Sequence, residues 1–312
     1  MAVLGYLAVA AGVAGVVAHF RAPGSGVALG VSAFSPYLML CSPLALLLLG
    51  VSLRRWALVL PGAATLFLLF VQAPLFVAQS TPVHARDLRV MTLNLRLGQA
   101  DPDSVVAAAR HSGAEVLMLE ELTASEQDAL ETAGLDRLLP YRATDPRNTA
   151  QGTGLWSRYP LRDVTRHSGF TFALVTARVA VPGVPREALA VALHMAGPWP
   201  QSQEWERDIT RLASYLPQLA HDGPTVVGGD FNATQDVPQF RDLLRDGYHD
   251  AVEQSGAGFQ PTFPADHWPG PMIGIDHVLL RDAVARSAHT VSVRGSDHRA
   301  LVAVVALDRQ AG

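Results

Sequence analysis

The stretch from Pro224 to Thr234, with the sequence PTVVGGDFNAT, indicates how the C-terminal part of the chain folds. Its first half is a short apolar run, which is typical of a buried strand, and polar residues follow at Asp230 and Asn232. Strand ends beside glycine turns can hold side chains rigidly and leave them open to a ligand. The stretch therefore predicts a buried strand that presents an aspartate and an asparagine at its end.

Two further predicted strands downstream carry the same kinds of side chain. One, GIDHVLL at residues 274–280, contains Asp276, and the other, GSDHRALV at residues 295–302, contains Asp297 and His298. Both combine an apolar run with acidic and imidazole groups at one end. Three such strand ends predict one converging hydrolytic site.

Upstream segments supply further parts of this site. The strand RVMTLN ends at Asn94, and VALH ends at His194. The strand EVLML is followed by Glu120 and Glu121. Gly154–Pro160, with the sequence GLWSRYP, has a glycine at its start and a Ser-Arg-Tyr-Pro end. Amide, carboxylate and imidazole groups thus recur at strand ends along the whole C-terminal part.

In this order the segments resemble the endonuclease/exonuclease/phosphatase superfamily. Its members include DNase I-like nucleases, abasic-site endonucleases, inositol-polyphosphate 5-phosphatases and bacterial sphingomyelinases. The resemblance covers about Asp87 to Leu307. Strands that alternate with helices in places and with hairpin turns in others predict an α/β fold of two mixed sheets with helices outside. We therefore expect a four-layer sandwich of two packed mixed β-sheets flanked by helices.

The N-terminal part is far more apolar than the rest. The chain has 312 residues, is 49% hydrophobic and has a mean hydropathy of +0.20, and the excess lies before residue 80. Ala2–Phe20, Val27–Leu53 and Trp56–Ala78 each approach or exceed the ~20 residues that cross a bilayer as a helix. A cleaved signal peptide is the alternative for the first stretch, but that stretch lacks a basic start. These stretches predict three transmembrane helices before the catalytic domain.

The predicted division is a three-helix transmembrane anchor at residues 1–79, a linker at 80–86 and a catalytic domain at 87–312. Arginines at 54 and 55 lie between the second and third spans, so the positive-inside rule puts that turn and the N-terminus in the cytoplasm. Basic residues just after the third span count against this orientation. We expect a multi-pass protein of the plasma membrane with an extracytoplasmic catalytic domain.

Charge and composition bear on the partners. The net charge is -4, the isoelectric point is near 6.2, and the chain contains no lysine. Proteins that grip duplex DNA usually have a basic face, so nucleic acid is not an expected partner. The lipid bilayer and a phosphorylated or pyrophosphorylated, lipid-linked substrate are expected, and the sequence does not indicate a protein partner.

The resemblance implies a divalent metal, Mg²⁺ or Mn²⁺, because such ions take oxygen ligands and neutralise phosphoryl oxygens. Glu121 is the implied principal ligand, with Asn94 beside it. Relatives usually have glutamine just before this glutamate, whereas here the position is Glu120. Either glutamate can therefore be the ligand, and we prefer Glu121. Glu120 is otherwise an outward-facing or hydrogen-bonded strand residue.

The resemblance also implies groups that act on the phosphate. Asp230 would hold the attacking water, and Asn232 would bind a phosphoryl oxygen. His194 occupies a position where relatives carry histidine or tyrosine, and it would contribute positive charge or a hydrogen-bond donor to the transition state. Each of these roles follows from the resemblance and not from spacing alone.

Two downstream motifs complete the implied catalytic set. His298 would contact the phosphate or the attacking water, and Asp297 would orient it and fix its protonation. Asp276 is expected near the leaving oxygen. His277 follows on the other face of its strand and is more readily explained by a structural role.

The tryptophans allow two interpretations. Pro261–Pro271 is rich in proline, so it predicts a stiff, extended loop whose aromatic residues line a substrate cleft. Trp199, Trp205 and Trp268 can equally be aromatic residues that rest at the lipid headgroups. Trp205 also falls in the apolar spacing of a helix predicted from about Gln203 to Leu219.

The functional hypothesis is a membrane-anchored, Mg²⁺-dependent phosphoric ester hydrolase. Three-span, outward-facing members of the superfamily resemble VanJ-like proteins of glycopeptide (teicoplanin-type) resistance, which implies a cell-wall lipid carrier as substrate. A phospholipase C or sphingomyelinase-like lipase and a surface endonuclease are alternatives. A catalytically idle, membrane-tethered binding module is a further alternative, but binding alone would not need the complete set of site residues.

Overall fold

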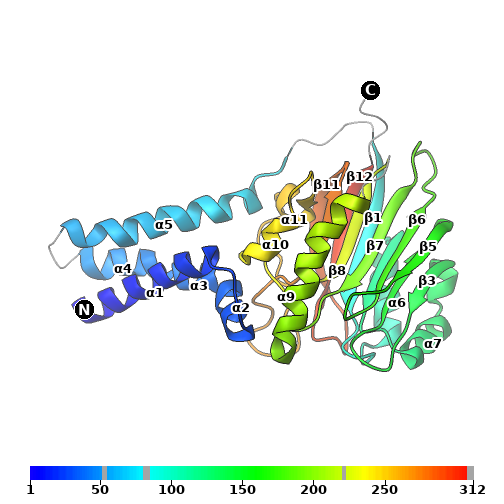
Figure 1. Ribbon diagram of the computed structural model, residues 1–312, viewed down its shortest axis with the longest axis horizontal. Coiled ribbons are helices and arrows are strands. Elements are labelled where there is room, and N and C mark those ends of the chain that lie inside the picture. The colour runs from blue at the N-terminus through cyan, green and yellow to red at the C-terminus, as the bar shows by residue number, and fades with distance from the viewer. Residues whose placement is uncertain (51–54, 80–84, 220–222, 308–312) are drawn as a thin grey trace.

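The computed structural model describes residues 1–50, 55–79, 85–219 and 223–307. Two six-stranded mixed sheets pack face to face, helices cover both outer sides, and a bundle of apolar helices projects from one side (Figure 1). The predicted arrangement of two mixed sheets flanked by helices is confirmed. Arg54 and most of the predicted linker lie outside the described residues.

Each sheet mixes parallel and antiparallel neighbours. The first has the order β11 (Ala283–Ser292), β12 (Arg299–Leu307), β1 (Arg86–Asn94), β2 (Val116–Glu120), β4 (Thr153–Ser157), β3 (Tyr141–Asp145). The second has the order β5 (Leu161–His167), β6 (Leu174–Val179), β7 (Ala188–His194), β8 (Thr225–Asp230), β10 (Asp276–Arg281), β9 (His249–Asp250). The parallel pairs are β1 with β2 and β7 with β8.

Because side chains alternate along each strand, the two faces of a sheet contribute to different hydrophobic cores. In β1, Leu88 and Val90 belong to the core between the sheets, whereas Met91 and Leu93 face the outer helices of the first sheet. Those outer helices are α6 (Pro102–Ser112), α7 (Ala124–Ala133) and α8 (Leu135–Leu138). Most of the central strands are therefore buried on two faces, which explains why they appear in the sequence as continuous apolar runs.

The outer layer of the second sheet is built around α9 (Pro198–Tyr215). Its residues Trp205, Ile209 and Leu212 are buried against that sheet, as helical spacing predicts. Trp205 is 1% exposed, and its Nε1 donates to the Phe231 carbonyl at 3.0 Å. The headgroup interpretation is therefore wrong for Trp205. Short helices complete the layer: η3 (Leu216–Leu219), α10 (Pro238–Asp242) and α11 (Ala251–Gln254).

The N-terminal helices pack through small residues. On α1 (Ala2–Phe20) the buried positions include Gly5, Ala8, Gly12 and Gly15, which share one face. A Cβ atom at Gly12 would lie 2.0 Å from the Ser42 hydroxyl oxygen, so the helices approach as closely as glycine permits. Such small-residue faces are typical of helix association in membranes. The partner helices are α3 (Ser35–Met39), α4 (Cys41–Gly50) and α5 (Val59–Gln72), with η1 (Arg55–Leu58) and η2 (Ala73–Phe76) at the ends of α5.

The outer surface of this bundle is apolar. Leu47 is 73% exposed and Phe70 is 75% exposed. Two helices, Ala2–Phe20 and Arg55–Phe76, are long and apolar enough to cross a membrane, and a third span requires counting a bent pair of helices as one. That pair consists of Gly26–Ala33 and Ser35–Gly50, which meet at 57°. These helices suggest membrane association, and the predicted count of three spans stays a prediction.

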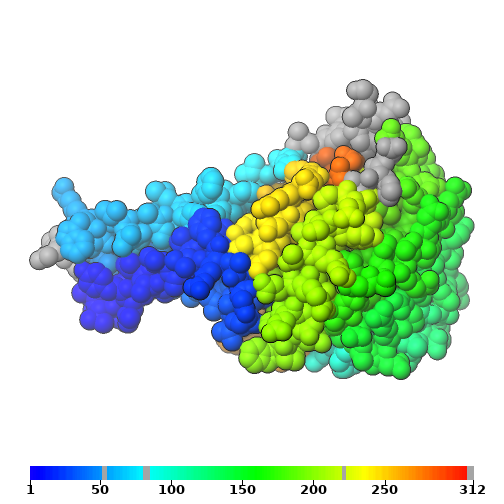
Figure 2. Space-filling model, viewed as in Figure 1, coloured from blue at the N-terminus to red at the C-terminus, as the bar shows by residue number. Residues whose placement is uncertain are grey.

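The bend separates α2 (Gly26–Ala33) from the rest of the predicted second span. Leu29 of α2 is 3% exposed and belongs to the core cluster that α9 also forms. Figure 1 shows α2 lying beside α9, and Figure 2 shows the blue N-terminal surface in contact with the yellow and yellow-green surface of α9 and α10. The predicted span Val27–Leu53 is therefore bent within its described part, because α2 buries its apolar face against α9.

Hydrogen bonds also join the bundle to the catalytic part. Tyr37 Oη donates to the Met272 carbonyl at 2.6 Å, and His19 Nδ1 lies 3.2 Å from Asp236 Oδ1. The Arg241 guanidinium donates to the His19 carbonyl at 2.6 Å. The bundle is thus docked on the two sheets through side chains from several helices.

Candidate active site

Strand alternation brings the polar strand-end residues together. Five polar residues each lie an even number of positions from an inward-facing apolar residue or glycine in their own strand, so they face inward too. They are Asn94, Glu120, His194, Asp230 and Asp276. The register pairs Asn94 with Glu120, and it places Asp230 between His194 and Asp276. All five are buried at one end of the core between the sheets. The site therefore lies at the edge where the two sheets meet.

The glycine pair before Asp230 permits this close approach. A Cβ atom at Gly228 would lie 2.4 Å from the Met118 sulfur of the opposite sheet. A Cβ atom at Gly229 would lie 1.8 Å from the Leu193 carbonyl oxygen of the neighbouring strand. Both distances are far below van der Waals contact, so any side chain here would push β8 away from its neighbours. The Gly-Gly-Asp sequence thus places Asp230 deep between the sheets.

Asp230 is the centre of the cluster. Its Oδ2 accepts from Asn94 Nδ2 at 3.0 Å and lies 3.5 Å from His194 Nε2 and 3.8 Å from His298 Nε2. Its Oδ1 accepts from the Asn232 backbone N–H at 2.8 Å. Burial alone would raise the pKa of Asp230, but the His194 hydrogen bond and the charge of His298 lower it to about 2. Asp230 is therefore an ionised carboxylate, and hydrogen bonds hold both of its oxygen atoms in place.

His298 is oriented by Asp276 and not by its sequence neighbour. The His298 Nδ1–H donates to Asp276 Oδ2 at 2.8 Å. Asp297 instead lies with its Oδ2 4.0 Å from Arg96 Nε. The expectation that Asp297 orients His298 is wrong, because the Asp276 carboxylate takes the hydrogen bond from His298 Nδ1. Ser296 fixes the turn, since its hydroxyl donates to the Asn94 carbonyl and accepts from the His298 backbone N–H.

The surroundings of His298 keep its ring charged. Burial would lower its pKa, but the carboxylates of Asp276 and Asp230 outweigh burial and raise the pKa to about 10. The ring of Phe263 lies with its centroid 4.9 Å from that of His298. The Nε2 atom of a cationic His298 is consequently a hydrogen-bond donor directed toward the Asp230 side of the site.

His194 and Asn232 lie on the other side of Asp230. His194 Nδ1–H donates to the Ala150 carbonyl at 3.0 Å, which leaves Nε2 toward Asp230. Burial lowers the pKa of His194, but Asp230 outweighs it and the net shift is upward. Asn232 has a left-handed backbone with φ of 50°, and its Nδ2 donates to the Met195 carbonyl at 2.9 Å. Both residues lie beside Asp230, and their implied roles on the phosphate stay predictions.

The two glutamates after β2 have different environments. Glu120 is fully buried, and its Oε1 accepts from the Thr92 hydroxyl at 2.9 Å. Burial and the nearby Asp276 charge raise the pKa of Glu120 well above its usual range, which favours its neutral form. Glu121 has a φ of 56° and turns back toward Asn94, whose Nδ2 donates to it at 3.2 Å. Glu120 is thus a hydrogen-bonded strand residue, and Glu121 is partly open to solvent.

The donor groups fit a hard divalent cation. Oxygen atoms of Glu121, Asn94, Asp230 and Asp276 lie around the site, and such ions prefer oxygen ligands. Among the described residues, Oδ1 of Asp276 and Oε2 of Glu120 are buried without a hydrogen-bond partner, as expected where an ion or water completes the site. The site residues can therefore accommodate a metal ion.

A second grouping of possible ligands overlaps this one. Ligand atoms of Asp230, Asp276 and His298 all lie within 4.8 Å of one another. His298, however, already donates to Asp276 through Nδ1 and carries a proton on Nε2 at neutral pH. A protonated ring cannot ligate a metal. The two carboxylates of this triad, Asp230 and Asp276, therefore remain candidate metal ligands beside Glu121 and Asn94.

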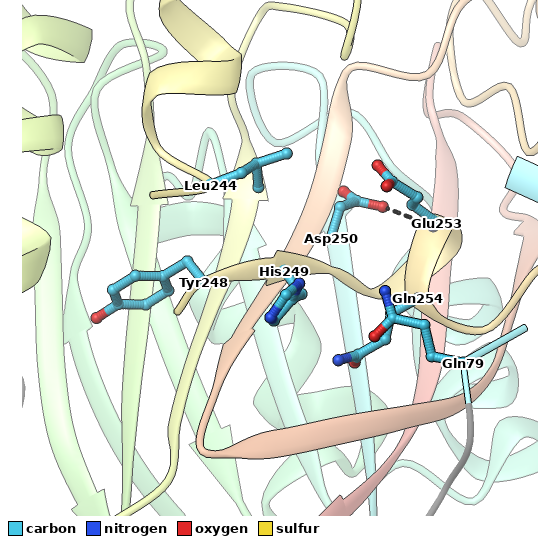
Figure 3. A pocket seen from close by; sticks show the side chains of 7 residues that line it. All are labelled: Gln79, Leu244, Tyr248, His249, Asp250, Glu253 and Gln254. Carbon is cyan, nitrogen blue, oxygen red and sulfur yellow. Dashed lines mark hydrogen bonds between the residues drawn. The ribbon is translucent and has the colours of Figure 1, made fainter. Parts of the chain in front are cut away.

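His277 makes structural contacts outside the candidate active site, and a hollow near it is not part of that site either. His277 Nδ1 lies 2.7 Å from Asp250 Oδ2, and its Nε2 lies 2.9 Å from the Ala233 carbonyl. Asp250 also caps α11 by accepting from the backbone N–H groups of Val252 and Glu253. Asp250 and Glu253 line a hollow of about 150 Å³, and their side chains are drawn in Figure 3. Its lining residues are Gln79, Leu244, Tyr248, His249, Asp250, Glu253 and Gln254.

Comparisons with known proteins place this site in a family. The model of the Endonuclease/Exonuclease/phosphatase family matches residues 91–298, which extend from β1 to His298. No curated protein matches the chain. The family match spans every residue of the candidate site.

Solved structures share the fold. The endonuclease/exonuclease/phosphatase from Bacteroides vulgatus has a TM-score of 0.57 at 16% identity, over 72% of this chain and 100% of that chain. Humanized D. rerio TDP2 has a TM-score of 0.60 at 15% identity, over 70% of this chain and 98% of that chain. D. rerio TDP2 complexed with single-strand DNA product has a TM-score of 0.57 at 15% identity, over 70% and 98% of the two chains. At these identities the likeness shows the fold, and with the family match, the chain belongs to the endonuclease/exonuclease/phosphatase family.

Proposed function

We propose that the chain is a membrane-anchored, divalent-metal-dependent hydrolase of a phosphate ester or pyrophosphate carried by a lipid. Family membership suggests phosphoesterase or nuclease activity. The observation that carries the proposal is Asp230, an ionised carboxylate buried between His194 and His298. A carboxylate held between two imidazoles can orient a water molecule while the rings bind phosphoryl oxygens.

In the proposed reaction, water attacks phosphorus and the bond from phosphorus to the leaving oxygen breaks. Asp230 orients the water and accepts its hydrogen bond, and the proton released by the water balances the one gained by the leaving group. His298 and His194 donate to the phosphoryl oxygens, and Asp276 keeps His298 oriented. Glu121 and Asn94 would hold a Mg²⁺ or Mn²⁺ ion, which supplies positive charge to the phosphoryl group.

The anchor supports a lipid-linked substrate. Its apolar helices are docked next to the loops that carry Asp236 and Met272, a few residues from Asn232 and Asp276 respectively. A phosphate in a membrane lipid is therefore close to the site at all times. The resemblance to VanJ-like resistance proteins favours the pyrophosphate of a cell-wall lipid carrier. A phosphodiester lipid, as in phospholipase C or sphingomyelinase reactions, is the next candidate.

A substrate panel tests the proposal. Purified full-length protein is assayed for phosphate or phosphomonoester release from an isoprenyl pyrophosphate, a phosphocholine lipid, an inositol phosphate and plasmid DNA. We expect the fastest turnover on the isoprenyl pyrophosphate. Faster cleavage of plasmid DNA would make the protein a nuclease, and no release from any substrate would support the binding-module alternative.

The proposed orientation predicts an exported C-terminus. The C-terminal end of α4 and the N-terminal end of α5 lie at the end of the bundle remote from the two sheets, as does the N-terminus (Figure 1). With the arginines of that turn in the cytoplasm, alkaline phosphatase fused after Gly312 should be active, and a reporter that requires the cytoplasm should fail. Moving the charge, by Arg54→Ala and Arg55→Ala with arginines added beside Arg21, should weaken the orientation. A cytoplasmic C-terminus would contradict an outer-leaflet substrate and leave inner-leaflet lipids as candidates.

A further inference from the structure

Aromatic side chains gather where the helix bundle meets the catalytic part. The ring of Tyr37 lies 5.7 Å from that of Phe34 and 6.5 Å from that of Phe259, between ring centroids. Phe259 is 53% exposed, and Phe76, at the end of η2, is 65% exposed. Aromatic residues concentrate at the depth of the lipid headgroups in membrane proteins. This junction therefore has the composition of a membrane–water boundary.

Trp199 lies at the same junction. A Cβ atom at Gly26, the first residue of α2, would lie 3.2 Å from Cε3 of Trp199 and 2.3 Å from the Pro198 carbonyl oxygen. Gly26 follows the turn that leaves α1, so Trp199 lies where the apolar helix α1 ends. Its side chain is nevertheless 75% exposed. A large exposed aromatic residue at this position lacks a covering partner among the described residues.

Trp268 lies on a segment that joins the active site to the bundle. At one end of this segment Phe263 contacts His298, and the Ala265 backbone N–H donates to the Asp297 carbonyl at 2.6 Å. At the other end the Met272 carbonyl accepts from Tyr37. Trp268 lies between these two attachments and is 95% exposed. Trp268 is therefore exposed at the surface between the active site and the bundle.

The other end of the bundle has features of a second membrane–water boundary. Trp56, 64% exposed, lies at the start of the apolar helix that runs from Arg55 to Phe76. Those 22 residues are about 33 Å long at the helical rise, close to the ~30 Å of a bilayer core. If one membrane–water boundary lies near Trp56, the length of this helix puts the opposite boundary near Phe76. That is the level of the aromatic junction.

We infer that Trp199 and Trp268 rest in the headgroup layer of the bilayer that holds the bundle, so that the active site opens at the membrane surface. The inference rests on the proposed membrane anchoring. Tryptophan suits this layer because its ring is apolar and its N–H is polar. The enzyme then takes the phosphate of a membrane lipid at headgroup depth, without lifting the lipid out of the bilayer.

Fluorescence quenching tests the position of the two tryptophans. Full-length protein is reconstituted in phosphatidylcholine–phosphatidylglycerol vesicles that contain lipids brominated either near the headgroup or near the chain end. The contribution of each tryptophan is the difference between the native protein and its Trp199→Phe or Trp268→Phe variant. We expect both contributions to be quenched, and more strongly by the shallow bromines. If the bromine atoms leave the emission of Trp199 and Trp268 unquenched, the inference is overturned.

A matched control places a tryptophan away from the junction. Tyr141 is 41% exposed on β3, at the edge of the first sheet remote from the bundle (Figure 1). The tryptophan added by Tyr141→Trp should therefore contribute emission that bromine does not quench. If bromine quenches it equally, the quenching does not report on depth, and the inference loses its support.

Activity provides a second readout. The double variant Trp199→Ser, Trp268→Ser should lose about tenfold in kcat/KM on a vesicle-borne substrate, because two headgroup contacts are removed. On a soluble, short-chain form of the same substrate its kcat/KM should fall much less. Equal losses on both forms would show that the tryptophans act on the site and not on the membrane. Absence of hydrolysis by the native protein would overturn the proposed function alone, because quenching still tests the inference.

Discussion

Asp230→Asn is expected to lower kcat by at least ~100-fold in a protein that stays folded, because loss of a positioned acid or base commonly has an effect of this size. The substitution keeps the shape of the side chain but removes the charge between His194 and His298. It also replaces a hydrogen-bond acceptor for water by an amide. Steady-state kinetics on the best substrate of the panel measures the loss, and circular dichroism with thermal unfolding checks the fold.

Asp242→Asn is the matched control for this experiment. Asp242 is a surface residue at the end of α10 that pairs with Arg245 at 2.7 Å. Its substitution should leave kcat within about twofold, since surface changes away from the site have small effects. A folded Asp230→Asn variant with near-native turnover would remove Asp230 from the mechanism.

EDTA is expected to abolish activity, and Mg²⁺ or Mn²⁺ should restore it, because the site offers oxygen ligands to a hard cation. Glu121→Ala should raise the metal concentration for half-maximal activity by at least ~10-fold. Glu121 is partly open to solvent, and its two carboxylate oxygens accept from Asn94 Nδ2 and from the Leu97 backbone N–H, so the carboxylate is already held beside Asn94. Activity measured against metal concentration gives the shift.

Glu120→Gln separates the two glutamates. Glu120 is buried, has a raised pKa and accepts a hydrogen bond from Thr92, so an uncharged amide of the same size should replace it with little change in the metal requirement. Alanine is a poorer choice here, because it would leave a cavity in a buried site. If Glu120→Gln raises the metal requirement more than Glu121→Ala does, Glu120 is the ligand. Full activity in chelator would contradict metal dependence altogether.

Much of the candidate site could be predicted because strand alternation is a local property. Asn94 and Asp230 follow apolar runs, so their approximate place at strand ends is fixed by the sequence itself. That these ends converge depends on which strands pair, and here the family resemblance supplied the order. The structure brings Asn94, Glu121, His194, Asp230, Asn232, Asp276 and His298 to one edge between the sheets.

The partner of His298 could not be predicted from nearness in sequence. Asp297 precedes it directly but points toward Arg96, whereas Asp276 reaches it from another sheet. Pairing between distant residues depends on how the sheets pack, and no local pattern reports that. Arg96 itself, with its Nη2 2.9 Å from Asp266, was missed for the same reason.

Two parts of the fold escaped prediction because their composition is ambiguous. β5 (Leu161–His167) is an exposed edge strand with few apolar residues, and β11 (Ala283–Ser292) mixes small and polar residues. The bend after α2 is invisible to hydropathy, since the residues on both sides of it are apolar. Only packing on α9 distinguishes α2 from the span that follows.

Docking of α2 on α9 joins the N-terminal helices to the outer core of the second sheet. The solved structures described above are covered over 98–100% of their length by 70–72% of this chain, so the shared fold takes up only that part of it. Here Leu29 fills part of the outer core of the second sheet. An exchange of the N-terminal region for an unrelated membrane anchor would therefore leave a vacancy in the catalytic part. In evolutionary terms, the two parts of this protein are not interchangeable modules, and substitutions on α2 and α9 should be inherited together.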